Sequence, residues 1–124
     1  MSTVFTQIIE GKIPSYKIYE DEKTLAFLDI EPETAGHTLV IPKIEVDKIY
    51  ELPDEYYAAV WDTAKKVAAR MEEVLGARTM LKVIGTDVPH AHIHLTSHDP
   101  NYQPGQRFET TPEYFVEMQK KLQF

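Results

Sequence analysis

Three histidines alternate with apolar residues at positions 90–95, where the sequence reads HAHIHL. Successive side chains of a β-strand point to opposite faces, so this pattern predicts a strand with two very different faces. One face carries the imidazoles of His90, His92 and His94, and the other carries apolar side chains. The chain therefore has to fold around a sheet with a hydrophobic core on one face and chemically useful groups on the other.

Short runs of β-branched, aromatic and aliphatic residues predict the other strands of this sheet. We expect five strands, of which the first two form a hairpin, at Tyr16–Tyr19, Thr24–Leu28, Thr38–Ile41, Met80–Ile84 and Ala91–Leu95. A tight connection at Gly85-Thr86-Asp87 is expected to join the last two strands.

Apolar residues at three- and four-residue steps predict one long amphipathic helix over residues 53–75, which Gly76 ends. Shorter helices are expected at residues 3–10, where Gly11 follows, and at Pro112–Leu122. Meander strands, a long helix and then two more strands indicate an α+β fold around one mainly antiparallel five-stranded sheet.

The size, charge and composition of the chain exclude several classes of protein. With 124 residues and 43% hydrophobic content, we expect one domain spanning residues 1–124. A net charge of −7 disfavours a nucleic-acid binder, because such proteins usually carry clustered Lys and Arg. The absence of cysteine excludes disulfides, thiolate metal sites and a cysteine nucleophile. With no leader-like start and no run of 18 apolar residues, we expect a cytoplasmic protein without a membrane partner.

The three alternating histidines are open to three interpretations. A solvent-facing strand that carries histidine by chance is credible for one residue, but here three of the chain's five histidines share one face. A metal site is the second interpretation, since His at i and i+2 on a strand can ligate zinc. However, His90 and His94 lie roughly 13 Å apart along an extended strand, too far to chelate one ion easily.

Nucleophilic catalysis is the third interpretation, and the one we favour. A neutral imidazole can attack phosphorus through one nitrogen while an acceptor holds its other N–H and fixes the tautomer. His92 is flanked by imidazoles on both sides, which discourage it from carrying a proton. His92 is therefore the best-placed nucleophile, and His94 could donate a hydrogen bond to a phosphate oxygen or to the leaving group.

Three stretches of the sequence together resemble the histidine-triad (HIT) family. They are TVFTQIIEGKIPSYKIYEDEKTLAFLDI, EPETAGHTLVIPK and HAHIHLT, and they follow the family order over most of residues 3–96. The resemblance implies an α+β half-barrel sheet that pairs into a two-fold homodimer. It also implies hydrolysis or transfer at the α-phosphate of a purine nucleotide through a covalent nucleotidyl-histidine.

The resemblance assigns roles to individual residues. The family nucleophile falls on His92, and the histidine that contacts phosphate and leaving group falls on His94. His37 supports them, and His90 completes the predicted catalytic group. The aspartate that accepts hydrogen bonds from the ribose falls on Asp29, although an aspartate that ends a strand is as readily a turn cap. The apolar walls around the base, each of which could be plain core, fall on Val4, Phe5, Ile8, Phe27, Ile30 and Leu39.

The sequence departs from the family just before the histidines. Many members have a longer glycine-rich loop with an Asn and a Gly-Gln pair, whereas here the stretch is residues 82–89, with Thr86 at the Gln position. Asp87 falls where many members have a small residue that contacts phosphate. A carboxylate would repel a polyphosphate there, so we expect Asp87 to point outward and the Val88 N–H to bind the phosphate. His98, beyond the run, is expected at the surface.

A second departure concerns zinc. Some members hold a structural zinc with two cysteines near the N-terminus, a later histidine and the first histidine of the run. The corresponding positions here are Thr3, Thr6, Glu45 and His90. Threonine hydroxyls are poor zinc ligands, so we expect no structural zinc. The covalent step requires no metal, and Mg²⁺ would accompany only a polyphosphate substrate.

The leading hypothesis is therefore an enzyme, either a phosphoramidase or a dinucleoside polyphosphate hydrolase. The alternatives are a nucleotide-sensing module with negligible turnover and a metal-binding protein that uses the histidine strand. The sequence does not distinguish an amine from a phosphate chain as the leaving group, or adenine from guanine as the base.

Overall fold

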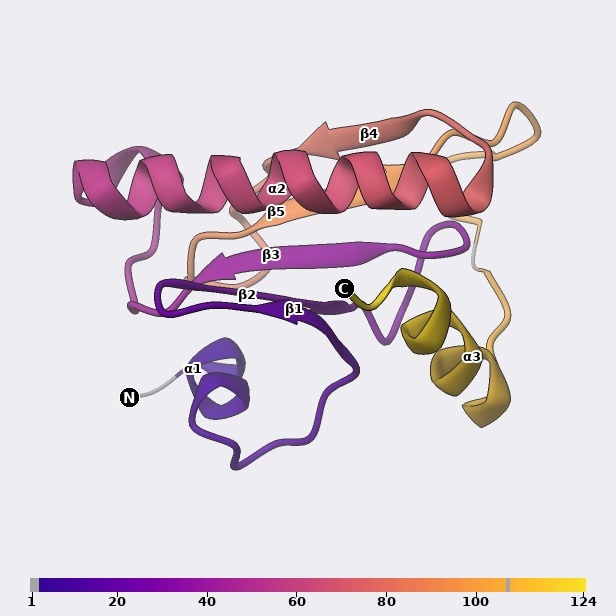
Figure 1. Cartoon of the computed structure of the whole chain (residues 1–124). Helices are drawn as coiled ribbons and strands as arrows, with labels where there is room; N and C mark the ends of the chain where they lie inside the picture. The colour runs from indigo at the N-terminus through magenta and orange to yellow at the C-terminus, as the bar shows by residue number, and fades with distance from the viewer. Residues whose placement is uncertain (1–2, 107) are drawn as a thin grey trace.

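The computed structural model describes residues 3–106 and 108–124. Five strands form one antiparallel sheet in the order β1-β2-β3-β5-β4, as predicted for an α+β fold (Figure 1). In chain order the elements are α1 (Val4–Ile9), β1 (Lys17–Glu20), β2 (Thr24–Leu28), β3 (Thr38–Pro42), a 3₁₀ turn (Ile49–Glu51), α2 (Asp54–Leu75), β4 (Thr79–Lys82), β5 (Ile93–Ser97) and α3 (Pro112–Leu122).

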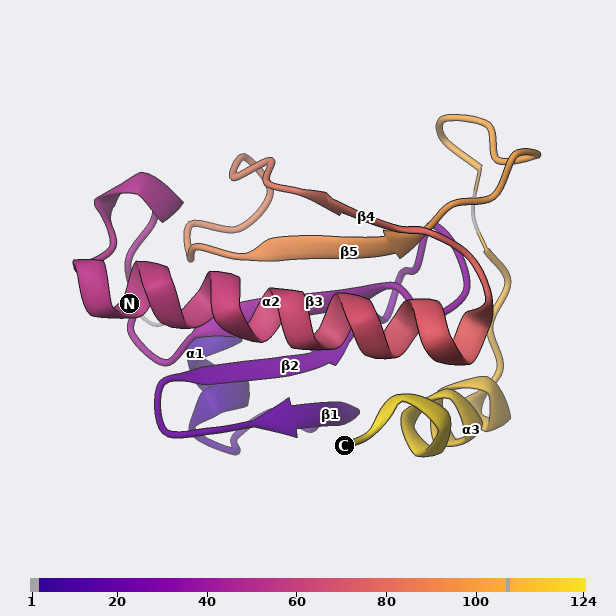
Figure 2. The ribbon, with the colours of Figure 1, turned by 45° about the horizontal axis from the view of Figure 1, so that its top comes forward.

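The sheet separates two hydrophobic cores because alternate residues of each strand face opposite ways. Figure 2 shows α2 in front of the sheet and α1 behind it. On the α2 side, apolar residues of the helix pack against Ala26, Leu28, Val40, Ile93 and Leu95. On the α1 side, the second core consists of Phe5, Ile8, Leu25, Phe27, Leu39 and Ile41. The imidazoles of His90, His92 and His94 therefore lie on the α1 side of the sheet.

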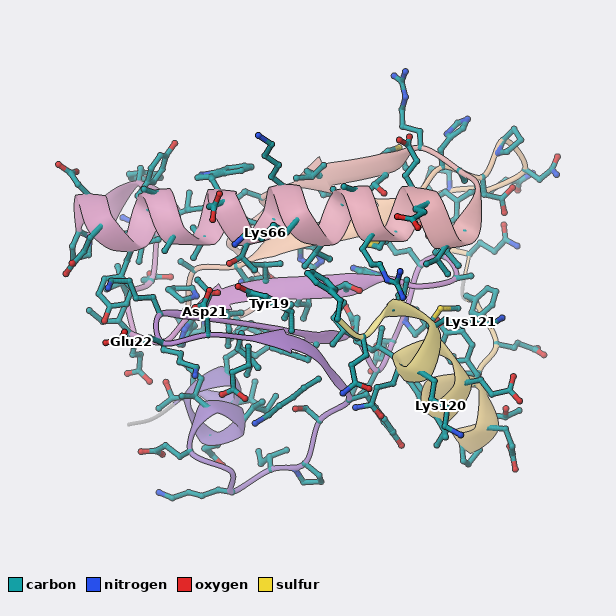
Figure 3. All side chains as sticks on the ribbon, viewed as in Figure 1. Tyr19, Asp21, Glu22, Lys66, Lys120 and Lys121 are labelled. Carbon is teal, nitrogen blue, oxygen red and sulfur yellow. The ribbon has the colours of Figure 1, made fainter. Side chains whose placement is uncertain are left out.

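The long helix ends where the sequence predicts. Pro53 is its N-cap, acidic Asp54 and Glu55 occupy the first turn, and Gly76 ends it with a left-handed φ of 70°. Its side chains also reach β1, since Lys66 lies over the ring of Tyr19, with Nζ 5.7 Å from the ring centroid (Figure 3). The Tyr19 hydroxyl donates to Asp21 at 3.0 Å. The Lys66 contact thus joins α2 to β1, and the hydrogen bond to Asp21 fixes the position of the Tyr19 hydroxyl.

The last helix is the predicted one, Pro112–Leu122. The side chain of Thr111 caps its start by accepting from the N–H of Tyr114, and Lys120 and Lys121 lie in its last turn, where the helix dipole favours cations (Figure 3). The helix packs on β1 and α2, and its Tyr114 hydroxyl accepts from the Gly36 N–H at 2.9 Å. The last helix thus supports the turn that precedes His37.

The connection between β4 and β5 differs from the prediction. We expected a tight turn at Gly85-Thr86-Asp87, but residues 83–92 form a long link, and β5 begins only at Ile93. The His90 N–H donates to the Val88 carbonyl at 2.8 Å and the Ala91 N–H donates to the Val46 carbonyl at 2.7 Å. Because these donors are used outside the sheet, the backbone cannot join the ladder before Ile93.

No helix in the part of the chain that the structure describes is long and apolar enough to cross a membrane.

Candidate active site

A cleft of about 450 Å³ opens on the α1 side of the sheet. Its lining combines the apolar second core with His37, His94, Asp29 and Asp87. All eight residues predicted to bind the nucleotide line it, namely Val4, Phe5, Ile8, Phe27, Asp29, Ile30, Leu39 and Val88. The resemblance therefore brought together residues that do meet in space, although Val4 and Ile30 are exposed at the rim.

Sequence reasoning missed other parts of this cleft. Ile13, Pro14 and Ile84 add apolar wall, and Glu33 adds a carboxylate. Ile84 was expected within a strand, and only the path of the 83–92 link brings it to the cleft. No local pattern in the sequence marks these residues, because separate loops position them.

His92 has a single tautomer available when its ring is neutral. Its Nδ1 lies 2.6 Å from the carbonyl oxygen of His90, and a carbonyl can only accept, so Nδ1 carries the proton. The ring is 1% exposed and Phe5 packs edge-on against it, with the ring centroids 5.1 Å apart. Both contacts fix the ring and leave Nε2 as the nitrogen with a free lone pair in the neutral ring. Nε2 faces the side chain of Asp87.

His94 and His37 form a hydrogen-bonded pair with the opposite arrangement. The Glu33 N–H donates to Nδ1 of His37 at 3.0 Å, so the His37 proton lies on Nε2. That nitrogen is 3.0 Å from Nδ1 of His94 and donates to it. The proton of His94 is therefore on Nε2, which is buried and has no hydrogen-bond partner among the described residues. The pair thus presents one free N–H donor next to His92, the predicted nucleophile.

Burial keeps this pair uncharged. It lowers the pKa of His37 to about 4, with Glu33 opposing and Lys82 adding to the shift. Burial also lowers the pKa of His94, and the neighbouring imidazoles of His92 and His37 lower it further. Near neutral pH both rings are neutral, so His94 acts as a hydrogen-bond donor and not as a cation.

His90 does not reach the cleft. Its Nε2 donates to the Pro42 carbonyl at 3.1 Å, and its Nδ1 accepts from the Thr3 hydroxyl at 3.1 Å. Burial lowers its pKa. Both ring nitrogens of His90 are thus engaged outside the cleft, and a catalytic role for this ring stays a prediction. The residue acts through its backbone carbonyl, which fixes the tautomer of His92.

The four residues at the positions of the family's zinc ligands do meet in space, but their polar groups form hydrogen bonds with one another. Glu45 accepts from the Thr3 N–H at 2.9 Å and from the Thr6 hydroxyl at 2.6 Å, while the Thr3 hydroxyl contacts Nδ1 of His90. Each of these donors already has an acceptor. Two hydroxyls, one imidazole and one carboxylate do not fit a tetrahedral structural zinc.

Asp29 divides its two oxygens between two roles. Oδ1 accepts from the Glu31 N–H at 2.9 Å, as in a turn cap. Oδ2 lies 3.5 Å from Nε2 of His37 and lines the cleft with it. Burial raises the pKa of Asp29, although the Glu31 N–H opposes the shift. The side chain thus has one oxygen for the fold and one oxygen at the ligand site.

Asp87 points into the site, contrary to the expectation that it would point outward. Its carboxylate oxygens lie 3.1 and 3.2 Å from Nε2 of His92, and one of them lies 3.5 Å from Nε2 of His94. Burial tends to raise the pKa of Asp87, but His92 and the backbone N–H groups of residues 87 and 88 outweigh it, so the pKa falls below its usual value. An ionised carboxylate can only accept, so its contact with His92 is a hydrogen bond only in the state in which Nε2 carries a proton. Displacement of Asp87 together with loss of that proton frees the Nε2 lone pair.

Among residues 3–106 and 108–124, two groups of side chains bring ligand-type atoms within 4.8 Å of one another, and both contain His94. One group adds Asp29 and His37, and the other adds Asp87 and His92. Metal binding through the group with Asp87 and His92 would require an unprotonated Nε2 on His94, where the hydrogen bond from His37 places the proton. In the group with Asp29, Nε2 of His37 already donates to Nδ1 of His94. This arrangement suits an oxyanion better than a metal ion.

Comparison with known proteins agrees with this geometry. The sequence matches the HIT domain family over residues 10–101. It is 42% identical over 112 residues to "Protein hit" of Bacillus subtilis, covering 85% of this chain and 74% of that protein. It is 38% identical over 96 residues to the adenosine 5'-monophosphoramidase HNT1 of Saccharomyces cerevisiae, covering 74% of this chain and 60% of that protein.

Among solved structures, a Hit-like protein of Bartonella henselae, described as involved in cell-cycle regulation and as holding an unknown ligand, superposes with a TM-score of 0.88. The two sequences are 28% identical, and the match covers 98% of this chain and 93% of that chain. The family match spans most of the sequence, and the fold agrees over nearly all of it. The chain therefore belongs to the HIT family, as its alternating histidines indicate.

Proposed function

We propose that this protein cleaves purine nucleotide conjugates at the α-phosphate, with His92 as the nucleophile. The proposal rests above all on one pairing: an acceptor holds Nδ1 of His92, while Nε2 of His94 beside it carries a free N–H. A nucleophilic nitrogen and an oxyanion donor side by side are what attack at phosphorus requires. Adenosine 5'-monophosphoramidases among the relatives support a nucleotide substrate.

The reaction has two displacements. In the first, Nε2 of His92 forms a bond to phosphorus while the bond to the leaving group breaks, and the leaving group departs with the electron pair and takes a proton from solvent. In the second, water attacks phosphorus, the N–P bond breaks and one proton returns to solvent. One water molecule is consumed overall, and an alcohol or amine acceptor in its place makes the protein a transferase.

The other residues position the substrate. His94 donates its Nε2–H to the phosphoryl oxygen or the leaving group, and His37 holds the tautomer that makes this possible. Asp29 accepts from the ribose hydroxyls through Oδ2. The base packs between the apolar walls that Phe5, Ile8 and Phe27 provide. No step requires a metal, and Mg²⁺ accompanies only a polyphosphate substrate.

Trapping the intermediate tests this proposal. A quench during turnover of an adenosine phosphoramidate should leave one nucleoside monophosphate on His92, detectable by mass spectrometry of the peptide. His92→Ala should abolish both the adduct and turnover while nucleotide affinity stays within about tenfold, because the base and ribose contacts remain. His98→Ala is the matched control, since His98 is exposed, and it should behave like the natural protein. Full activity in His92→Ala would end the proposal.

A nucleotide-binding module without turnover is the second candidate. The observation that favours it is the Asp87 carboxylate against Nε2 of His92, since the nucleophile is covered in the ligand-free protein. The quench distinguishes the two, because a module that only binds nucleotides forms no adduct. A two-fold homodimer and a cytoplasmic location, with no nucleic-acid partner, complete the proposal.

A further inference from the structure

The carboxylate of Asp87 occupies the position that a substrate phosphoryl group needs. For attack, phosphorus has to lie about 3–3.5 Å from Nε2 of His92. In the ligand-free protein both carboxylate oxygens are already at 3.1 and 3.2 Å from that nitrogen. One of them is also near the free Nε2–H of His94. The carboxylate oxygens therefore occupy the space that the phosphoryl group needs for attack.

A substrate can displace this carboxylate but cannot remove it from the site. The Asp87 side chain is 46% exposed, so it has room to turn toward solvent. It belongs to the same link as Val88, which lines the cleft, and Val88 packs against the second core. Because Val88 anchors the neighbouring backbone, a displaced carboxylate stays beside the phosphoryl position and near the leaving group.

The remaining charges of the cleft add to this effect. Asp29, Glu31 and Glu33 also line it, and no lysine or arginine is part of the lining within the described residues. Lys82 is close by, but its Nζ is paired with Glu33 at 2.6 Å. A chain of phosphates binds where positive groups offset its charge, and this cleft offers neutral imidazoles and carboxylates instead.

We propose that Asp87 is a specificity-determining residue that selects α-phosphate substrates with an uncharged or cationic leaving group and rejects polyphosphates. This inference rests on the proposed function and deepens it. A carboxylate and a phosphate a few ångströms apart repel strongly at a half-buried site, and each further phosphate adds to the repulsion. An amine leaving group brings no such charge, and a protonated amine is attracted.

Binding measurements test the proposal without depending on turnover. Asp87→Asn keeps the size of the side chain and removes its charge. Affinities for adenosine, AMP and ADP should be measured by calorimetry for this variant and for Asp47→Asn. Asp47 is exposed and has no side-chain hydrogen bond among the described residues, so its variant makes the same change in net charge far from the cleft. Asp87→Asn should leave adenosine affinity unchanged, tighten AMP about tenfold and tighten ADP more than AMP.

Kinetics give the second measurement. The ratio of kcat/KM for diadenosine tetraphosphate to that for an adenosine phosphoramidate should rise about tenfold or more in Asp87→Asn and stay unchanged in Asp47→Asn. Equal changes for adenosine, AMP and ADP, or an unchanged ratio in an active enzyme, would overturn the proposal. If no substrate is turned over but the graded change in affinity is found, the charge selection stands and the proposed function fails.

Discussion

His92 and His94 carry the same side chain two residues apart, yet their surroundings give their rings opposite roles. The carbonyl of His90 places the proton of His92 on Nδ1, whereas the His37 ring places the proton of His94 on Nε2. One Nε2 therefore has the free lone pair that the proposed nucleophile needs, and the other is a donor. The alternation in the sequence predicts that both rings share a face, but only their separate partners decide which proton each ring carries.

Asp29 should contribute to ribose binding independently of its role in the turn. Asp29→Asn keeps the acceptor for the Glu31 N–H but removes the negative charge at the cleft. We expect ribonucleotide binding to weaken by about 1–3 kcal/mol, because hydrogen bonds to a charged acceptor are lost. Binding of 2′,3′-dideoxy analogues should hardly change. Competition binding with both ligand series measures the difference, and equal losses would make Asp29 only a turn cap.

The His37 ring should make the fold sensitive to acid. Its pKa is about 4 in the folded protein, below the 6.5 of a free histidine, so the unfolded chain binds more protons between these values. Stability from this residue is therefore complete above pH 6.5 and declines as the pH falls toward 4, by about 3 kcal/mol in total.

Denaturant titrations at several pH values check this. His37→Gln should flatten the decline between pH 6.5 and 4, while His98→Gln, which changes an exposed histidine, should keep it. A His37→Gln curve parallel to that of the natural protein would show that other groups cause the acid sensitivity.

Asp87 marks the limit of sequence reasoning about single residues. The sequence places it next to the phosphate site and suggests that a carboxylate there should turn outward. Its actual direction depends on the 83–92 link, whose backbone bonds to Val46 and Val88 have no signature in the sequence. A contact among separate segments decides the direction, so local pattern could not predict it.

Elements were more predictable than the links between them. The bounds of β2 and α3 agree with prediction, because alternation, helical spacing and capping residues are local signals. The start of β5 was placed two residues too early, since the alternation continues through residues 90–92 although the backbone has left the ladder. Side-chain pattern shows which face a residue occupies, and it does not show where the ladder begins.

A hydrogen-bonded cluster of Thr3, Thr6, Glu45 and His90 should hold α1 to the sheet. The helix has only six residues and places Phe5 in the site, so its position affects the cleft. Thr6→Val keeps the shape and removes the hydroxyl that donates to Glu45 at 2.6 Å. We expect the melting temperature to fall by a few degrees, because the short helix loses a charge-assisted hydrogen bond, although this contact is exposed to solvent.

Thr110→Val is the matched control, since the Thr110 hydroxyl makes no hydrogen bond with the described residues, and it should leave the melting temperature unchanged. Chelator should have no effect on either variant or on the natural protein, and metal analysis should find no stoichiometric zinc. About one zinc per chain, together with a lower melting temperature in chelator, would show that a metal holds α1 instead.

At the scale of the whole molecule, α2 and α1 cover the two faces of the sheet, and β1 and β4 are its edge strands. The C-terminus reaches β1, where the Phe124 N–H donates to the Ile18 carbonyl. Strand β4 pairs only with β5, and the apolar side chains of Met80, Leu81, Val83 and Ile84 are exposed along and just beyond it. An edge strand with exposed apolar residues is prone to pair with another chain. Because α2 and α1 cover the two faces of the sheet, the β4 edge is the place where a second chain can extend it.

We expect two copies to pair through β4 about a two-fold axis, which makes the contact self-complementary and extends the sheet across both chains. Light scattering after size exclusion should then give twice the 14.3 kDa of one chain.

Leu81→Lys should shift the population to monomer, because a charge placed in an apolar strand contact is costly to bury. Val116→Lys on α3, at a side chain with a similar exposure of 43% against 41%, should leave the dimer intact. The cleft lies within one chain, so the Leu81→Lys monomer should still bind AMP. A natural protein that elutes as a monomer at every concentration would contradict the pairing.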